Sequence, residues 1–368
     1  MKLFFTLLLL LSCTTLVFIA CSRNLAPQGA NRPSAGSINY RDGRFHNLVS
    51  TKLNSENQNM FKATIDFLRG SPDRTPARSL PVAPRVAEPS PETDELRLTW
   101  FGHSTLLLEI DGQTLLTDPM FSDRASPLAF IGPKKFETDR TFSVDDLPEI
   151  DAVLISHDHY DHLDRESITR LKEQVDRFYV PLGVGAHLQR WGVEEAKIVE
   201  LDWWEARQQG PLTLVATPAR HFSGRGLRDR NKTLWASWTI LVTSQRAFFS
   251  GDSGYFDGFR EIGEKFGPFD VTMLESGAYN DAWADIHMRP EETVQAHLDL
   301  QGNVLLPIHW AKFNLALHPW TEPIERLLTE AEIRGAVTIT PLQGEEVFPN
   351  MMEEQRRWWF SAGSAHHG

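Results

Sequence analysis

The stretch LISHDHYDHLD, residues 154–164, carries histidines and aspartates at a spacing suited to metal coordination. His157, His159, Asp161 and His162 fall within six positions, directly after the apolar run DAVLIS. A turn at the end of a buried strand can aim such side chains at one point, and imidazole and carboxylate are ligands for zinc and similar divalent ions. A solvated polar loop would not need four candidate ligands, so the stretch predicts a metal site.

Three further candidate ligands stand just after other apolar runs. They are His221 in TPARHFSG, Asp252 in FFSGDSGY and His309 in LLPIHWAKF. Each is weak evidence alone, because a core histidine or a turn aspartate would look the same. Together they suggest that the ends of several strands supply the remaining ligands.

The elements that must position these residues can be read from short apolar runs separated by helical patterns. The segment LRLTWFGHSTLLLEIDGQTLLTDP alternates apolar and polar residues on both sides of Asp111-Gly112, which predicts a β-hairpin with a tight turn. We expect stacked sheets covered by helices on their outer faces, an α+β architecture. Further strands are predicted at 152–155, 178–180, 212–216, 235–242, 247–249, 271–274, 304–308 and 337–339, and helices at 164–175, 291–300 and 322–333.

Composition restricts the function classes. The chain has 368 residues and a formal net charge of -12, so its acidic surface disfavours nucleic acid as a partner. Its two cysteines, Cys13 and Cys21, both lie near the N-terminus. The folded part therefore has no disulfide and no thiolate metal ligand.

The N-terminus resembles the secretory leader of a bacterial lipoprotein. Residues 1–20 have one positive charge and an apolar core, and FIAC matches a lipoprotein cleavage box in which Cys21 becomes the lipidated first residue. Ser22 then favours the outer membrane, with the protein facing the periplasm of the bacterial cell envelope. An ordinary signal peptide or an uncleaved membrane anchor is the alternative.

The rest of the chain divides by composition. We expect an extended N-terminal tether over residues 21–95 that lies against the following domain, with one short helix at 57–68. A catalytic domain is expected over 96–350 and a C-terminal tail over 351–368.

The histidine and aspartate pattern resembles that of the metallo-β-lactamase fold, a four-layer αβ/βα sandwich. The segments FGHSTLLLEIDGQTLLTDPMFSDRASP, LPEIDAVLISHDHYDHLD, TPARHFSGR, FFSGDSGY and IHWAKF, in this order, are similar to N-acylphosphatidylethanolamine-hydrolysing phospholipase D. This similarity covers residues 96–348. It implies two Zn²⁺ ions, or another divalent metal, that share a hydroxide able to attack phosphorus.

The resemblance also implies a role for individual residues. One zinc would be held by His157, His159 and His221, the second by Asp161, His162 and His309, with Asp252 as the bridge. Asp161, Asp252 and His287 would take part in catalysis. Asp118 and His103 would support the ligands, although Asp118 could instead form a turn and His103 could be a core histidine. Tyr160 would contact the substrate. Two further substrate contacts are suggested by residue type rather than by the resemblance. Trp283 belongs to an aromatic-rich set that could flank acyl chains or be core, and Arg225 belongs to a basic run with Arg228, Arg230 and Lys232 that could meet phosphate or be a solvated loop.

By this resemblance the protein hydrolyses N-acylphosphatidylethanolamine to an N-acylethanolamine and phosphatidic acid. Its partners would be a phospholipid substrate and the membrane reached through the N-terminal lipid, and relatives can form homodimers. A general phosphodiesterase or a lactonase of the same fold is the first alternative, and a non-catalytic envelope lipoprotein with a structural metal is the second. A zinc β-lactamase is disfavoured because the commonest of these use a cysteine ligand.

Overall fold

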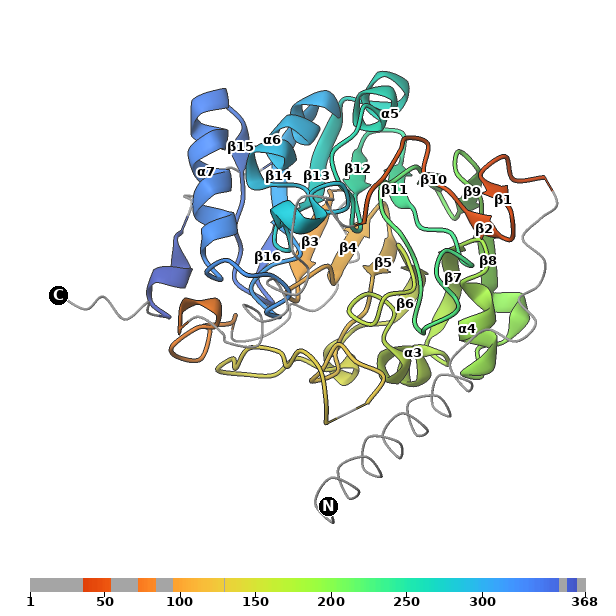
Figure 1. Cartoon of the computed structure of the whole chain (residues 1–368), viewed down its shortest axis with the longest axis horizontal. Helices are drawn as coiled ribbons and strands as arrows, with labels where there is room; N and C mark the ends of the chain where they lie inside the picture. Colours follow the sequence, from red (N-terminus) through yellow and green to blue (C-terminus); the bar gives the residue numbers. More distant parts are fainter. Residues whose placement is uncertain (1–35, 54–71, 84–94, 129, 351–355, 363–368) are drawn as a thin grey trace, which may run out of the picture.

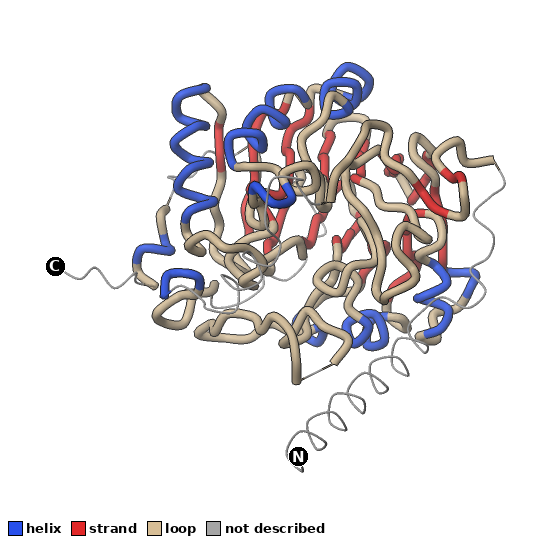
Figure 2. The backbone as a smooth tube through the Cα atoms, in the orientation of Figure 1, coloured by secondary structure: helices blue, strands red, loops and turns tan. Residues whose placement is uncertain are grey.

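Two seven-stranded sheets stack face to face, and helices cover their outer faces (Figure 1). In the described part of the chain, the strands of the two large sheets lie inside and the helices lie toward the outside (Figure 2). The predicted α+β, four-layer sandwich is therefore confirmed. The computed structural model describes residues 36–53, 72–83, 95–128, 130–350 and 356–362.

The first sheet combines an antiparallel and a parallel half. The strands from β16 to β5 pair antiparallel, and those from β5 to β8 pair parallel. Leu106 and Leu108 point into the core between the sheets, whereas Leu107 joins the cluster formed with α3 and α4, as expected for alternating strand residues. In spatial order the strands are β16 (Glu346–Val347), β3 (Arg97–Trp100), β4 (Leu106–Ile110), β5 (Gln113–Thr117), β6 (Ile150–Leu154), β7 (Val175–Pro181) and β8 (Ile198–Leu201); the helices are α3 (Arg165–Leu171) and α4 (Gly185–Arg190).

The second sheet repeats this pattern. Its strands pair parallel from β15 to β12 and antiparallel from β12 to β9. They are β15 (Val337–Thr338), β14 (Gly302–Ile308), β13 (Phe269–Glu275), β12 (Arg246–Phe249), β11 (Ser237–Leu241), β10 (Leu212–Thr217) and β9 (Ala206–Gln209). The helices beside it are α5 (Gly258–Phe266), α6 (Pro290–Asp299) and α7 (Glu322–Arg334). Short 3-10 helices occur at Pro72–Arg74, Val144–Asp146, Glu195–Lys197, Asp281–Trp283 and Trp358–Phe360.

The predicted strands and helices are found at these places, with shifted boundaries. Asp111 and Gly112 both have positive φ angles, 49° and 72°, as a tight primed turn requires. The helix predicted over 164–175 ends at Leu171 because Val175 already begins β7. Its start is fixed by Asp164, whose side chain accepts hydrogen bonds from the first-turn amides.

Both ends of the described chain pack on the domain. The N-terminal part forms a two-stranded ribbon, β1 (Tyr40–Arg41) and β2 (Arg44–Phe45), and Phe45 is fully buried. In the segment predicted as a tail, Trp358 and Trp359 are buried with ring centroids 5.4 and 5.5 Å from that of Trp310.

The predicted leader, Cys21 and the helix at 57–68 lie outside the described residues. Among the helices that the structure describes, none has the length and apolar character needed to cross a bilayer.

Lys312 has a buried amino group that ties three loops together. Its Nζ donates to the carbonyl oxygens of Phe101 and Met120, at 3.1 and 2.7 Å, and so joins the loop after β14 to the ends of β3 and β5. Burial lowers the pKa of Lys312 to about 7, and the charge of Lys135 acts in the same direction.

Stability should therefore depend on pH through Lys312. An unfolded lysine titrates near 10.5, so above about pH 7 the unfolded chain holds one proton more than the folded one. The free energy of unfolding of the wild type should rise relative to that of Lys312→Met by about 1.4 kcal/mol per pH unit between about pH 7 and pH 10. Urea titrations of both proteins across this range measure the difference. A difference that stays constant with pH would contradict a neutral Lys312.

Candidate metal centre

The seven predicted ligands converge at one edge of the sandwich, where carboxyl ends of strands from both sheets meet. β6 leads into the turn that carries His157, His159, Asp161 and His162. The other three follow strands of the second sheet: His221 after β10, Asp252 after β12 and His309 after β14. Side chains separated by up to 152 positions in the sequence therefore share one site.

The first ligand group consists of three imidazoles. His157 Nε2 lies 2.8 Å from His159 Nδ1, and His221 Nε2 lies 3.3 Å from the same His159 atom. His221 Nδ1 faces the carbonyl oxygen of Ile286 at 2.9 Å. Donation to that carbonyl fixes the ring and leaves Nε2 free to coordinate. With Asp252, the three residues form a set whose ligand atoms all lie within 4.8 Å of one another.

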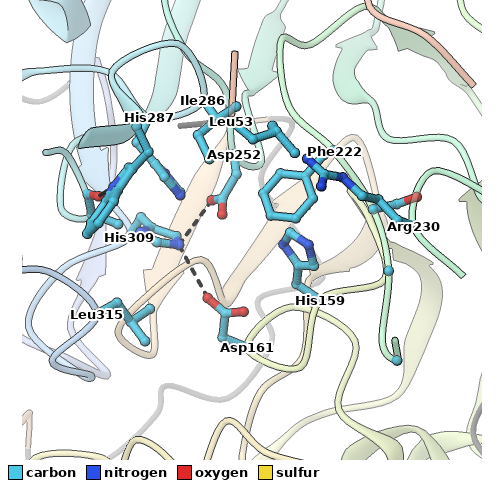
Figure 3. A pocket seen from close by; sticks show the side chains of 15 residues that line it. Leu53, His159, Asp161, Phe222, Arg230, Asp252, Ile286, His287, His309 and Leu315 are labelled. Carbon is cyan, nitrogen blue, oxygen red and sulfur yellow. Dashed lines mark hydrogen bonds and ion pairs between the residues drawn. The ribbon is translucent and has the colours of Figure 1, made fainter. Parts of the chain in front are cut away.

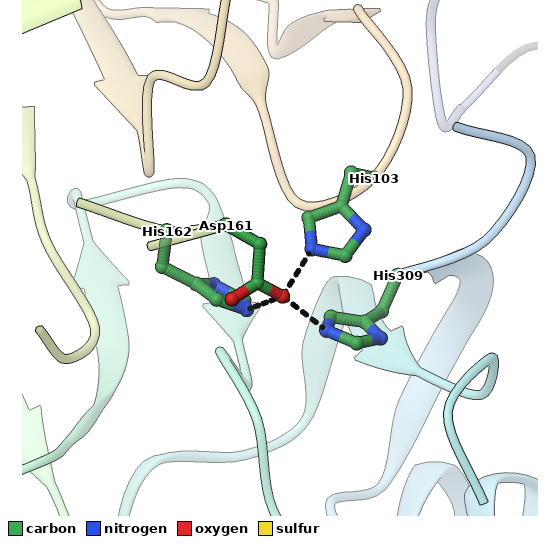
Figure 4. Close-up of side chains that lie close together, drawn as sticks. All are labelled: His103, Asp161, His162 and His309. Carbon is green, nitrogen blue, oxygen red and sulfur yellow. Dashed lines mark hydrogen bonds and ion pairs between the residues drawn. The ribbon is translucent and has the colours of Figure 1, made fainter. Parts of the chain in front are cut away.

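The second ligand group surrounds Asp161 (Figure 4). One oxygen of this carboxylate, Oδ2, lies 3.3 Å from His162 Nε2, 3.4 Å from His309 Nε2 and 2.9 Å from His103 Nε2. These four residues form a second set within 4.8 Å. His103, predicted as a supporting residue, is thus in contact with a candidate ligand and is itself buried.

Asp252 lies between the two groups. Its Oδ2 is 3.1 Å from His162 Nε2 and 3.8 Å from both His157 Nε2 and His221 Nε2. Its Oδ1 is 3.1 Å from His309 Nε2 (Figure 3). This is the position that a carboxylate bridging two ions would need.

The chemistry of the centre fits divalent cations. Within the part of the chain that the structure describes, His162 Nε2, Asp252 Oδ1 and His309 Nε2 are buried and have no hydrogen-bond partner beyond the ion-pair contacts among the candidate ligands themselves. A buried polar atom without a partner is costly, and metal coordination removes that cost. The donor set of imidazole nitrogens and carboxylate oxygens suits zinc as well as other transition metals.

The electrostatics of the site lead to the same conclusion. Burial alone would lower the pKa of His309, but the carboxylates of Asp252 and Asp161 outweigh it and raise this pKa to about 10. Burial would raise the pKa of Asp252, but the neighbouring His162 and His309 hold it well below its usual range. The carboxylates thus favour positive charge between them.

Asp118 orients two of the ligand histidines. Its Oδ2 is 2.7 Å from His162 Nδ1 and accepts a hydrogen bond from Ser156 Oγ at 2.5 Å, while Oδ1 accepts from the Ser156 amide at 2.7 Å. Ser156 Oγ in turn lies 2.9 Å from His157 Nδ1. Asp118 therefore occupies its predicted place beside a ligand histidine. Ser156 was missed, although its position directly after β6 was a signal.

Gly251 allows the turn that carries Asp252 to pack against Ser156. Its φ is +55°, and a Cβ there would lie 2.3 Å from the Ser156 Cβ. Any other residue would push the Asp252 turn away from Ser156. Asp118, His103 and His309 also have positive φ angles, at 33°, 56° and 64°. Such backbone strain at strand ends is typical of functional sites.

Asp158, inside the ligand motif, faces away from the centre and anchors the motif to the rest of the protein. It accepts hydrogen bonds from Gly224 N at 2.7 Å and Thr233 Oγ1 at 2.9 Å, and lies 3.3 Å from His187 Nε2. The motif turn and the loop that follows His221 are therefore held to each other. Asp158 was not predicted as a ligand, and the structure places it outside the two ligand groups.

The structure corrects the prediction for Arg225 and Tyr160. Arg225 is buried, and its Nη1 donates to the carbonyl oxygens of Asp158 and Leu163 at 2.7 and 2.8 Å. Tyr160 packs under its guanidinium and donates its hydroxyl to the Arg225 carbonyl at 2.7 Å. Neither side chain lines the pocket. Both side chains instead stabilise the ligand loop. The guanidinium of Arg225 is already bound by backbone carbonyl oxygens and is not available to a substrate.

A pocket of about 480 Å³ opens directly above the centre (Figure 3). Its floor includes four candidate ligands: His159, Asp161, Asp252 and His309. Its walls are mostly apolar and include the predicted Trp283, with Leu53, Phe222, Ala278, Ile286 and Leu315. Trp203, Trp235, Trp238 and Trp310 are instead core residues.

His287 lines the same pocket, as predicted. Its Nδ1 lies 3.3 Å from the buried Glu275 Oε2, and Glu275 Oε1 accepts a hydrogen bond from the Met288 amide at 2.8 Å. Glu275 thereby orients the His287 ring and leaves Nε2 as the nitrogen that can serve the pocket. Glu275 was not predicted, although it ends the apolar strand β13.

Comparison with known proteins agrees with this geometry. A family model described as a beta-lactamase superfamily domain matches residues 113–310. The chain belongs to the beta-lactamase superfamily. Within this superfamily, an uncharacterized protein of Mycobacterium tuberculosis is 48% identical over 333 residues, covering 89% of this chain and 88% of the relative.

Another superfamily relative carries a functional name. The N-acyl-phosphatidylethanolamine-hydrolyzing phospholipase D 1 of Caenorhabditis elegans is 35% identical over 263 residues, covering 68% of this chain and 73% of the relative. This confirms the predicted resemblance. Among solved structures, Igni18, a metallo hydrolase of Ignicoccus hospitalis, aligns with a TM-score of 0.52 and 22% identity, over 68% of this chain and 97% of that one. The chain therefore has the metallo-β-lactamase fold and the ligand set of a metal-dependent hydrolase.

Asp118→Asn should weaken metal binding without removing any ligand. The new amide group would present a donor to Ser156 Oγ and His162 Nδ1, where an acceptor is needed. The His162 ring would then lose its orientation directly, and the His157 ring would lose it through Ser156. We expect divalent ions to bind about 10- to 100-fold more weakly, measured by competition with a chromophoric chelator. Asp151→Asn is the control, because Asp151 accepts from Thr114 N at the opposite end of β6. Equal affinities in both variants would refute the role given to Asp118.

Proposed function

We propose that this protein is a metal-dependent phosphodiesterase of the phospholipase D type. Its substrate would be N-acylphosphatidylethanolamine, and its products an N-acylethanolamine and phosphatidic acid. The observation that carries the proposal is Asp252, which lies between two groups of ligands at the floor of an apolar-walled pocket. The C. elegans relative, named for hydrolysis of this lipid, supports the choice of substrate.

The open pocket favours catalysis over a structural metal. Structural zinc sites are usually closed by four protein ligands, whereas His159, Asp161, Asp252 and His309 all border the pocket. Two zinc ions held there would lower the pKa of water, and so supply a nucleophile near neutral pH, and would neutralise charge on the phosphodiester.

The protein's own residues complete the chemistry. The carboxylates of Asp161 and Asp252 can accept a hydrogen bond from the attacking water and hold it in line with the bond to be broken. His287, oriented by Glu275, can give a proton to the alkoxide oxygen that leaves with the N-acylethanolamine. Trp283, Phe222 and Leu315 line the pocket where acyl chains would lie.

The proposed location is the bacterial envelope, with Cys21 lipidated and the domain beside a membrane. A lipid anchor would raise the local concentration of a phospholipid substrate. This part of the proposal rests on the leader sequence.

A substrate panel tests the activity. The zinc-loaded protein should cleave N-acylphosphatidylethanolamine faster than phosphatidylethanolamine, bis(p-nitrophenyl) phosphate, a sugar lactone or a β-lactam, and release of phosphatidic acid can be followed by mass spectrometry. Asp252→Asn should abolish turnover, because it removes a charge shared by both ligand groups. Cleavage of bis(p-nitrophenyl) phosphate alone, or of the lactone alone, would contradict the assignment of a lipid substrate. If Asp252→Asn kept full turnover, the site assignment would fall.

Arg230 offers a second test, because it is the one arginine or lysine among the described residues that line the pocket. Its guanidinium lies 5.9 Å from the centroid of the Phe222 ring, and the side chain is exposed. A cation here would contact the phosphate in the ground state and the transition state alike. Arg230→Gln should therefore raise KM for the phospholipid about tenfold with little change in kcat.

Arg228→Gln is the matched control. It makes the same charge change in the same exposed loop, outside the pocket lining. If both variants raised KM equally, the effect would be general attraction of an anionic surface rather than recognition by Arg230.

A further inference from the structure

The N-terminal strap, defined as residues 45–53, lies across the loop that carries His221. It precedes the first strand of the large sheets by more than forty residues and falls outside the segment matched by the superfamily model. Two of its contacts reach the candidate centre itself: Asn47 touches the backbone of His221, and Leu53 lines the pocket.

Asn47 holds the His221 backbone through both ends of its side-chain amide. Its Nδ2 donates to the His221 carbonyl oxygen at 2.8 Å, and its Oδ1 accepts from the His221 amide at 3.1 Å. Trp235 Nε1 donates to the same Oδ1 at 3.1 Å. The paired bonds fix the position and the orientation of one peptide segment, as a strand partner would.

The strap also fixes the loop against which the His221 ring rests. Lys52 N donates to Asp285 Oδ2 at 2.8 Å, and Asp285 pairs with Arg220 at 2.9 Å. Arg220 Nη2 in turn donates to the Ser50 carbonyl at 2.9 Å. Next to Asp285, Ile286 supplies the carbonyl that faces His221 Nδ1. The backbone and the ring of this ligand are thus both held by groups that the strap secures.

We propose that the N-terminal strap is part of the catalytic centre, with Asn47 as the positioning residue that sets His221 for metal binding. This inference rests on the metal-binding part of the proposed function. A ligand held within a few tenths of an ångström of its coordinating position binds without reorganising a loop, whereas a loose loop must be ordered when the ion binds. Without Asn47, the amide and the carbonyl of His221 would lose the side-chain partners that hold them, and next to this residue the loop would keep its bonds at Arg220 to Ser253 and Gly254 and at the His221 ring.

The test compares Asn47→Ala with Thr51→Val in the full chain. Asn47→Ala removes both bonds to His221. Thr51→Val removes the acceptor that Arg220 Nε reaches at 3.2 Å, in the same strap but without contact to the ligand. In chelator competition with Zn²⁺, Asn47→Ala should bind the ion of the first ligand group, to which His221 belongs, about tenfold more weakly than the wild type. Thr51→Val should stay within about twofold of the wild type.

Thermal unfolding distinguishes positioning from general stability. A purely structural Asn47 would lower the melting temperature equally with and without Zn²⁺. The proposal expects a smaller rise in melting temperature on adding Zn²⁺ in Asn47→Ala than in the wild type. If Asn47→Ala fails to fold, Asn47→Asp serves in the same assays, because it keeps the acceptor for the His221 amide and places a repelling carboxylate oxygen where the donor to the His221 carbonyl was.

The outcomes separate this inference from the proposed function. If the wild type binds Zn²⁺ and Asn47→Ala binds it equally tightly, the inference is wrong and the proposed function stands. The inference is also wrong if Asn47→Ala and Thr51→Val weaken Zn²⁺ binding equally. If the wild type binds no divalent ion, the proposed function fails first.

Discussion

The structure depends on one constraint: buried carboxylates and imidazoles are packed at the junction of two sheets, where uncompensated charge is expensive. Oxygens of Asp161 and Asp252 lie 2.9 to 3.4 Å from ring nitrogens of three residues, His103, His162 and His309. Ring nitrogens of His157 and His159 lie 2.8 Å apart, close enough for one ion to contact both. Cations between the carboxylates would compensate this charge, and Asp118 and Ser156 orient the rings of His162 and His157 toward that position.

Much of this could be predicted from sequence because the ligands follow buried strands, and apolar runs are the strongest signal in a single sequence. The hairpin at Asp111-Gly112 and the placement of Asp252 and His309 both follow from strand ends. Helix limits were predicted less accurately. The residues after Leu171 fit a helix or a strand equally well in sequence, and in the structure β7 begins at Val175. The burial of Trp358 and Phe45 could not be read from the sequence, because both pack on surfaces that only the folded domain creates.

The supporting residues show where sequence reasoning ends. Arg225 and Arg230 stand five positions apart in one basic run, yet one braces carbonyls under the ligand loop and the other lines the pocket. Charge pattern cannot separate them, because the difference is set by which backbone carbonyls the fold brings near each side chain. Asn47 is harder still. Nothing in its neighbourhood marks it, and its role appears only when a segment 174 positions away comes to rest beside it.

The two sheets have the same internal arrangement, three antiparallel pairings followed by three parallel ones, and the centre joins them. The first sheet contributes the ligand turn after β6, and the second contributes Asp252 and His309 from parallel strands. Because ions bound there would contact both halves, part of their binding free energy would hold the sheets together at an edge that the core leaves polar. The N-terminal strap contributes at the same edge, because it contacts both His221, after β10, and Asp285, in the loop after β13. Metal binding and folding therefore have the same requirement at this edge: the candidate ligand side chains, which are unfavourable when buried without an ion, must be held at fixed distances from one another.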